Sequence, residues 1–171
     1  MLASRNVILM LAVVAAPLAA CGDDDEATRG AGEVASDEGA YGADCRPVGE
    51  ELAEDAAVTV DLQLGDYTFV PAELEVPAGI TTFEVENAGG EAHEVAFLPG
   101  GGDVPLTDDG APDEAALGEA GAFELEAFPP GEECSATYDL EPGRYTLFCV
   151  VESPDGETHY EKGMRGTLIV S

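Results

Sequence analysis

The residues of this sequence that could bind a transition metal are few and fall in two short stretches. The chain of 171 residues contains two histidines, His93 and His159. Cys149 ends the apolar run YTLFC, nine residues separate it from His159, and four residues separate His159 from Met164. Two imidazoles and a thiolate in one plane, with a weakly bound axial thioether, are the ligand set of blue-copper electron-transfer sites. These four residues therefore predict a copper site.

The pattern around the first histidine supports this interpretation. In HEVAFL, residues 93–98, His93 alternates in phase with Val95 and Phe97, so we expect its side chain to point toward the core. A buried imidazole near a buried thiol costs free energy unless both groups are paired, and one shared metal ion would pair them. Taken singly, each of these residue types is more often part of a core, and it is their coincidence that favours copper.

A catalytic role for the same residues is a weaker hypothesis. Cys149 as nucleophile and His93 as base would need a third group to orient the histidine, and an oxyanion site. No strand-turn-helix elbow or glycine-rich oxyanion motif adjoins Cys149 in the sequence. We therefore expect a protein that is not an enzyme.

The four cysteines call for different roles. Cys21 stands at the end of an apolar leader, which leaves Cys45, Cys134 and Cys149. Three cysteines cannot all pair, so one thiol stays free. We expect a possible disulfide between Cys45 and Cys134 and a free Cys149, while a Cys134–Cys149 bridge remains open.

The N-terminal part of the chain predicts export and anchoring. Residues 1–20 combine Arg5 with a short apolar run and small residues, which is typical of a signal peptide and too short to span a bilayer. The end of this run, LAAC, resembles the lipobox of bacterial lipoproteins, so we expect Cys21 to be lipidated. Residues 21–54 are rich in Gly, Ala and acid and predict a flexible tether. Residues 55–171 remain as one domain, outside the cytoplasm and anchored to the cell membrane.

Short alternating segments separated by Pro and Gly turns predict an all-β fold, an antiparallel β-sandwich of Greek-key type. One short helix is expected around residues 111–120, APDEAALGEA. The expected strands lie within residues 57–65, 81–87, 93–98, 122–128, 135–140, 143–150 and 167–170.

The net charge of the chain excludes some partners. The sequence has 36 acidic against 6 basic residues, a formal charge of −30. Nucleic acids and anionic lipid surfaces would be repelled. The acid is spread along the chain, which favours adaptation to high salt over steering of a cationic protein partner, although both remain open.

Three segments resemble the cupredoxin family, in its plastocyanin, auracyanin and halocyanin types. They are residues 87–95 (NAGGEAHEV), 145–149 (YTLFC) and 159–170 (HYEKGMRGTLIV). The resemblance covers about residues 56–171. It implies a cupredoxin-like fold and one type 1 copper.

By this resemblance, His93 and His159 would be equatorial nitrogen ligands, Cys149 the thiolate ligand and Met164 the axial ligand. It implies a membrane-tethered one-electron carrier, monomeric, with transient redox partners. A partner would dock where the edge of His159 reaches the surface, in an apolar patch with contributions from Val150, Val151 and Tyr160. The alternative is a module of the cell envelope that carries or stores copper, or binds a partner without metal.

Two features depart from the family pattern. Nine residues separate Cys149 from His159, where two to four are usual, and the Pro-Asp-Gly turn among them predicts a small hairpin that returns His159 toward Cys149. Glu94 stands where plastocyanin-like members often have an asparagine that braces the cysteine loop.

Overall fold

The computed structural model describes residues 47–48, 56–108 and 110–171. The predicted signal peptide, Cys21 and Cys45 lie outside these residues, so the predictions for them stay predictions. Within the described part of the chain, no helix is long and apolar enough to cross a membrane.

Four strands form one sheet. Their order is β3, β2, β5, β8, with β2 and β5 parallel and the other pairs antiparallel. Alternation of apolar and polar residues turns one face of this sheet inward, as Leu62, Leu64, Phe83 and Val85 are buried. The strands are β2 (Val58–Gly65), β3 (Thr68–Val70), β5 (Gly79–Asn87) and β8 (Glu133–Leu140).

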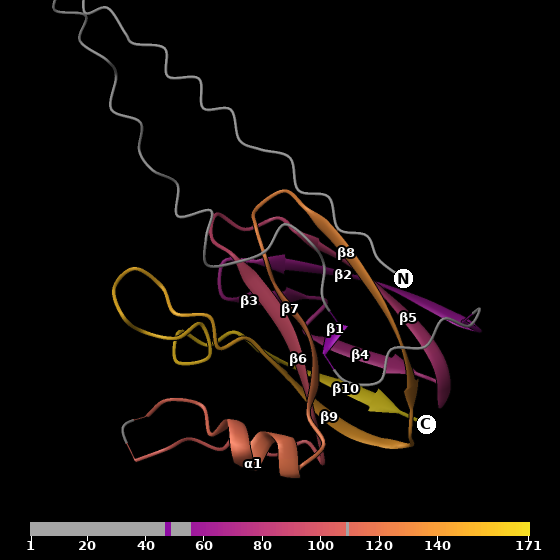
Figure 1. The fold of residues 1–171 in the computed structure, drawn as a ribbon. Helices are drawn as coiled ribbons and strands as arrows, with labels where there is room; N and C mark the ends of the chain where they lie inside the picture. Colours follow the sequence, from indigo (N-terminus) through magenta and orange to yellow (C-terminus); the bar gives the residue numbers. More distant parts are fainter. Residues whose placement is uncertain (1–46, 49–55, 109) are drawn as a thin grey trace, which may run out of the picture. The chain divides into compact units, whose positions relative to one another are not determined.

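Six strands form the second sheet, in the order β1, β7, β6, β9, β10, β4 (Figure 1). β10 and β4 are parallel, and the other neighbours are antiparallel. The strands are β1 (Pro47–Val48), β4 (Glu73–Val76), β6 (His93–Pro99), β7 (Phe123–Phe128), β9 (Gly143–Phe148) and β10 (Arg165–Val170). β1 lies inside the range predicted as tether.

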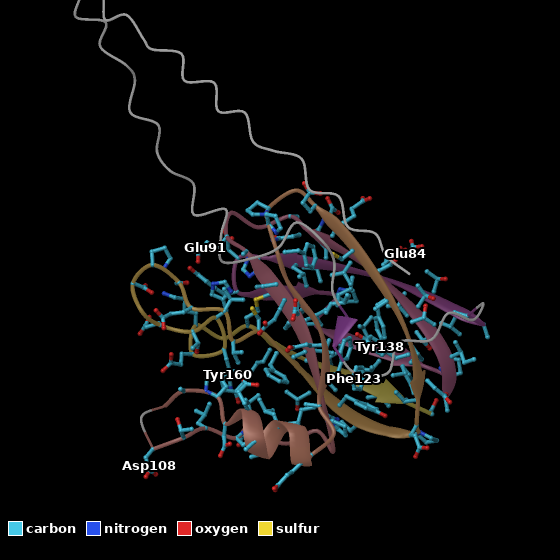
Figure 2. The ribbon with its side chains drawn as sticks, viewed as in Figure 1. Glu84, Glu91, Asp108, Phe123, Tyr138 and Tyr160 are labelled. Carbon is cyan, nitrogen blue, oxygen red and sulfur yellow. The ribbon has the colours of Figure 1, made fainter. Side chains whose placement is uncertain are left out.

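The two sheets pack face to face, and aromatic rings fill the space between them. Phe97 stacks on Phe123 with ring centroids 4.8 Å apart and contacts Phe83 at 4.9 Å. Tyr138 packs on Phe123 at 4.6 Å, and Figure 2 shows these two rings side by side. This arrangement confirms the predicted all-β sandwich, although its two parallel pairs make the sheets mixed. The short strands β3 and β4 were not predicted, because three or four residues are too few for an alternation of apolar and polar residues to be recognised.

The segment between β6 and β7 covers the outer face of the second sheet. It contains α1 (Glu114–Glu119), which confirms the predicted helix and begins where Asp113 accepts a hydrogen bond from the Ala116 amide at 3.0 Å. Because this segment packs on β6 and β9, both faces of β6 are buried, including Ala96 and Leu98 on the face opposite His93. The second apolar cluster formed in this way consists of Ala96, Leu98, Val104, Leu117, Phe148 and Tyr160.

Candidate metal centre

Two neighbouring strands bring the first histidine and the cysteine together. His93 is the first residue of β6, and Cys149 follows the last residue of β9. These strands pair antiparallel with Ala96 opposite Phe148, so the start of β6 lies beside the end of β9. Both His93 and Cys149 are fully buried, as the alternation in HEVAFL predicted for the histidine.

The second histidine completes a compact group of donor atoms. His93 Nδ1 lies 2.9 Å from His159 Nδ1, and Cys149 Sγ lies 3.3 Å from that same His159 nitrogen. The three donor atoms are all within 4.8 Å of one another, and all three residues are buried. One thiol and two imidazoles that converge on one point suit a copper ion, with the soft sulfur binding Cu(I) and the imidazoles binding Cu(II).

A hairpin returns the chain from Cys149 to His159, as predicted. Glu152 bridges Thr158, and the Gly156 amide donates to the Ser153 carbonyl at 2.9 Å across the turn. The His159 amide then donates to the Val151 carbonyl at 2.8 Å. The long interval therefore does not move His159 away from the cysteine.

The fourth predicted ligand lies at the end of the same segment. Met164 is fully buried and belongs to the apolar cluster that contains Cys149. Its amide donates to the His159 carbonyl at 2.8 Å, which ties its backbone to the second histidine.

The turn before His93 is built by a buried asparagine and a glycine. The Asn87 side-chain amide donates to the carbonyls of Glu91 and Phe128 at 3.0 and 2.8 Å, and its oxygen accepts from the Gly89 amide at 3.0 Å. A Cβ atom at Gly89 would lie 2.5 Å from His93 Nε2. The Asn-Ala-Gly sequence thus leaves just enough space for the imidazole.

The imidazole of His93 has no other strong partner. Its Nε2 has no hydrogen bond and lies 3.6 Å from Asp66 Oδ1. Burial, and then the neighbouring His159, lower the pKa of His93, which favours the neutral imidazole that a metal requires.

Glu94 takes over the bracing of the cysteine loop. Its Oε1 accepts a hydrogen bond from the Val150 amide at 2.6 Å. Burial raises the pKa of Glu94 to about 8. Burial also raises the pKa of the Cys149 thiol, while backbone hydrogen bonds from Glu94 and Val151 favour the thiolate. A metal that binds this sulfur must therefore displace its proton.

The edge of His159 does not reach the surface, so the predicted docking contact is wrong. His159 is fully buried, with the Tyr67 ring 5.2 Å from its centroid in an edge-on arrangement. Val151 and Tyr160 are buried as well, because the hairpin and the α1 segment pack over them. Of the three residues predicted to form the apolar patch, only Val150 is partly exposed.

Glu91 covers the second nitrogen of His159, and sequence reasoning missed it. Glu91 Oε2 lies 3.1 Å from His159 Nε2, and Figure 2 shows Glu91 beside the segment that joins β9 to β10. Burial alone would raise the pKa of Glu91, but hydrogen bonds from Ser153, His159 and Tyr67 together hold it below its usual value. No local pattern marks Tyr67 or Glu91, because their partners are distant in sequence.

Among the described residues, the other cysteine, Cys134, does not belong to this group. Cys149 is a free thiol, which excludes the Cys134–Cys149 bridge. Cys134 is disulfide-bonded, and it is buried within β8 rather than in the surface loop suggested by the sequence. Its predicted partner, Cys45, lies outside the described residues, so that pairing stays a prediction.

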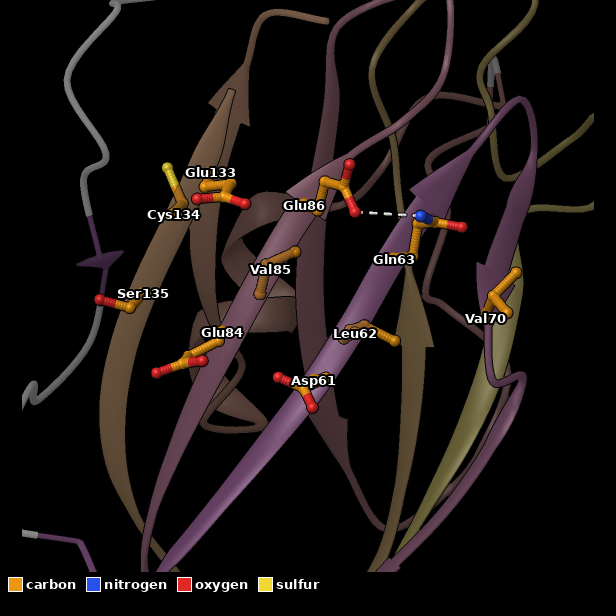
Figure 3. A pocket seen from close by; sticks show the side chains of 10 residues that line it. All are labelled: Asp61, Leu62, Gln63, Val70, Glu84, Val85, Glu86, Glu133, Cys134 and Ser135. Carbon is orange, nitrogen blue, oxygen red and sulfur yellow. Dashed lines mark hydrogen bonds between the residues drawn. The ribbon is translucent and has the colours of Figure 1, made fainter. Parts of the chain in front are cut away.

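A groove of about 640 Å³ lies on the four-stranded sheet, away from the predicted ligands (Figure 3). Carboxylates line it, and Gln63 donates to Glu86 across it at 3.0 Å. None of the four predicted ligands lines this groove. Its lining residues are Asp61, Leu62, Gln63, Val70, Glu84, Val85, Glu86, Glu133, Cys134 and Ser135.

Comparison with known proteins agrees with this chemistry. Residues 56–171 match the copper-binding proteins of the plastocyanin/azurin family. The structure of auracyanin B is 24% identical, with 73% of this chain and 97% of that chain covered and a TM-score of 0.56. A dithionite-reduced auracyanin from the photosynthetic bacterium Roseiflexus castenholzii is 22% identical, with 68% and 99% covered and a TM-score of 0.50. No curated protein matches the chain. The likeness to the auracyanins is one of fold. The family match spans more than half of the sequence. It establishes that this chain belongs to the plastocyanin/azurin family of copper-binding proteins, the cupredoxins that its motifs resemble.

Proposed function

We propose that this protein is a one-electron carrier whose type 1 copper is bound by His93, Cys149 and His159, with Met164 as a weak axial ligand. The observation that carries the proposal is the convergence of two imidazole nitrogens and one thiol sulfur, 2.9 and 3.3 Å apart, in a buried group. Bound copper would supply a one-electron couple between Cu(I) and Cu(II).

The frame around the ligands suits fast electron transfer. Two paired strands hold His93 and Cys149, and the hairpin returns His159 through backbone hydrogen bonds. Glu94 fixes the amide that follows Cys149. A rigid frame keeps the donor atoms in place in both oxidation states, and full burial keeps water from adding as a further ligand.

The place of action is a separate part of the proposal. A lipidated Cys21 and the tether after it would hold the domain at the outer side of the cell membrane, where redox proteins meet it transiently. The disulfide at Cys134 supports an oxidising compartment. We expect a monomer that forms small, short-lived contacts with its partners.

Visible spectroscopy of the full-length chain tests the redox role. Addition of Cu(II) should give an intense thiolate-to-copper charge-transfer band and a reversible one-electron wave. Cys149→Ser removes the sulfur with little change in size, so it should abolish the band while circular dichroism stays native. Ala136→Ser is the control, because it adds a hydroxyl at a buried site in β8 and should keep the band.

Two outcomes would contradict the carrier proposal. Absence of the band in the unmodified protein would remove the type 1 site itself. A band without a reversible wave would leave a copper-carrying or copper-storing module of the envelope, which is the alternative function.

A further inference from the structure

The carboxylate of Glu91 makes a partly buried contact with His159 that copper binding alone does not require. Its Oε2 lies 3.1 Å from His159 Nε2, the ring nitrogen opposite the one that faces Cys149. The side chain of Glu91 is 33% exposed, whereas that of His159 is fully buried. The far nitrogen of His159 therefore meets a carboxylate and not solvent.

Two distant parts of the chain donate hydrogen bonds that hold this carboxylate in place. The Tyr67 hydroxyl, in the turn between β2 and β3, donates to Oε1 at 3.1 Å. The Ser153 hydroxyl, in the hairpin after Cys149, donates to Oε2 at 2.9 Å. Glu91 itself comes from the turn between β5 and β6. Both carboxylate oxygens act as acceptors, and His159 Nε2, 3.1 Å from Oε2, is the third donor that they can serve.

This arrangement sets the proton position on His159. A neutral imidazole carries its proton on one nitrogen, and the hydrogen bond at that nitrogen decides which one. A carboxylate that accepts at Nε2 keeps the proton there and leaves the Nδ1 lone pair free. Nδ1 is the atom that faces Cys149 Sγ and His93 Nδ1.

We propose that Glu91 is a positioning residue that fixes the Nε2–H tautomer and the ring orientation of His159, with Tyr67 and Ser153 orienting its carboxylate. The nine-residue interval after Cys149 then has a role, because its hairpin supplies Ser153. The inference deepens the proposed function of the copper site. A carboxylate partner also makes a ligating imidazole more basic, so Glu91 favours Cu(II) over Cu(I) and lowers the reduction potential.

The first test needs no metal. Two-bond ¹⁵N–¹H correlation spectra of the metal-free, full-length chain with labelled histidine report which nitrogen of His159 carries the proton. We expect the Nε2–H form in the unmodified protein and a mixture of both tautomers in Glu91→Ala. Glu152→Ala removes an exposed carboxylate from the same hairpin and should leave the tautomer unchanged.

The second test uses the copper-loaded protein. Loss of a hydrogen-bond partner of a metal ligand weakens metal binding about 10-fold to 100-fold. If Glu91→Ala weakens Cu(II) binding tenfold more than Cu(I) binding, the reduction potential rises by about 59 mV. Ser153→Ala keeps the carboxylate but removes one of its supports, so it should give a smaller rise in the same direction.

The outcomes separate this inference from the proposed function. An unchanged His159 tautomer in Glu91→Ala, or an equal potential shift in Glu152→Ala, would overturn the role of Glu91 while a blue band still supported the copper site. Absence of the band in the unmodified protein would instead overturn the proposed function, and the metal-free spectra would still decide the tautomer.

Discussion

At the scale of single residues, the four predicted metal ligands are side chains enclosed by the rest of the domain. His93, Cys149, His159 and Met164 are all fully buried, and the first three converge within a few ångströms. Glu94 illustrates how a departure from the family pattern is absorbed. Its carboxylate accepts from the Val150 amide, so a different residue type still braces the cysteine loop.

Gly89 gives a prediction at this scale. A Cβ atom there would lie 2.5 Å from His93 Nε2, so Gly89→Ala must push the imidazole away from its position. We expect the free energy of unfolding to fall by about 1–3 kcal/mol, as for other overpacked sites, and Cu(II) binding to weaken. Denaturant titration and copper titration of the same sample measure both effects.

Gly90→Ala is the matched control for this prediction. The nearest atoms to a Cβ at Gly90 are the Asp66 carboxylate oxygens at 3.8 Å, which is ordinary contact. This variant should bind Cu(II) as the unmodified protein does. If Gly89→Ala and Gly90→Ala bound Cu(II) equally well and were equally stable, crowding of His93 would not determine metal binding.

At the scale of elements, the hairpin between Cys149 and His159 carries most of what is unusual in this protein. Its turn contains Gly156 at φ 87°, a left-handed conformation, and its last hydrogen bond joins the His159 amide to Val151. Lys162 forms ion pairs with Asp155 and Glu157 on the hairpin. The hairpin therefore lies over His159. The ring edge of His159, where a partner was expected to dock, is buried as a result.

Gly156→Ala tests this element. An alanine in the left-handed region costs about 1–2 kcal/mol, and no atom lies within 4 Å to add a packing effect. We expect the free energy of unfolding to fall by about that amount, and the His159 amide to exchange its hydrogen faster because the hairpin frays. Hydrogen exchange followed by NMR measures the second effect.

Gly118→Ala serves as the comparison, because it should change the free energy of unfolding in the opposite direction. Gly118 lies within α1, where alanine is favoured over glycine by up to about 1 kcal/mol, and no atom lies within 4 Å of its Cβ position. This variant should be slightly more stable and leave His159 exchange unchanged. If Gly156→Ala and Gly118→Ala changed the free energy of unfolding and the exchange of the His159 amide alike, strain in the turn at Gly156 would not explain the effect of Gly156→Ala.

At the scale of the whole molecule, charge decides how the chain can meet a membrane. A formal charge of −30 repels an anionic lipid surface, so electrostatic attraction cannot hold the protein there. The proposed lipid anchor at Cys21 would provide attachment without such attraction, and two or more acyl chains make it stable. Only Arg144, Lys162 and Arg165 are basic within the described residues.

Cys21→Ser is the prediction that follows. If acyl chains and not ion pairs anchor it, the unmodified protein should remain in the membrane fraction after a high-salt wash. The variant should appear in the soluble fraction with its copper band intact. Mass spectrometry of the N-terminal peptide should detect the acyl groups only in the unmodified protein, and a soluble unmodified protein would contradict the anchor.

The sequence alone predicted the all-β sandwich and the three residues that the structure brings together as a possible metal site, His93, Cys149 and His159. Alternation in segments such as VTVDLQLG determines which face of a strand is buried, and this is a local property of the chain. The Pro-Asp-Gly turn predicted the hairpin for the same reason. The rarity of His93 and His159 pointed to both histidines before any distance was known.

Only the tertiary structure decided what surrounds these residues. The burial of His159, the parallel pairs β2–β5 and β4–β10, and the contact of Glu91 with Tyr67 and Ser153 all join segments that are distant in sequence. No local pattern records such contacts, because they depend on how the sheets and turns pack. Residue types and their spacing are thus enough to predict the metal ligands, whereas the exposure of those ligands depends on how the whole molecule packs.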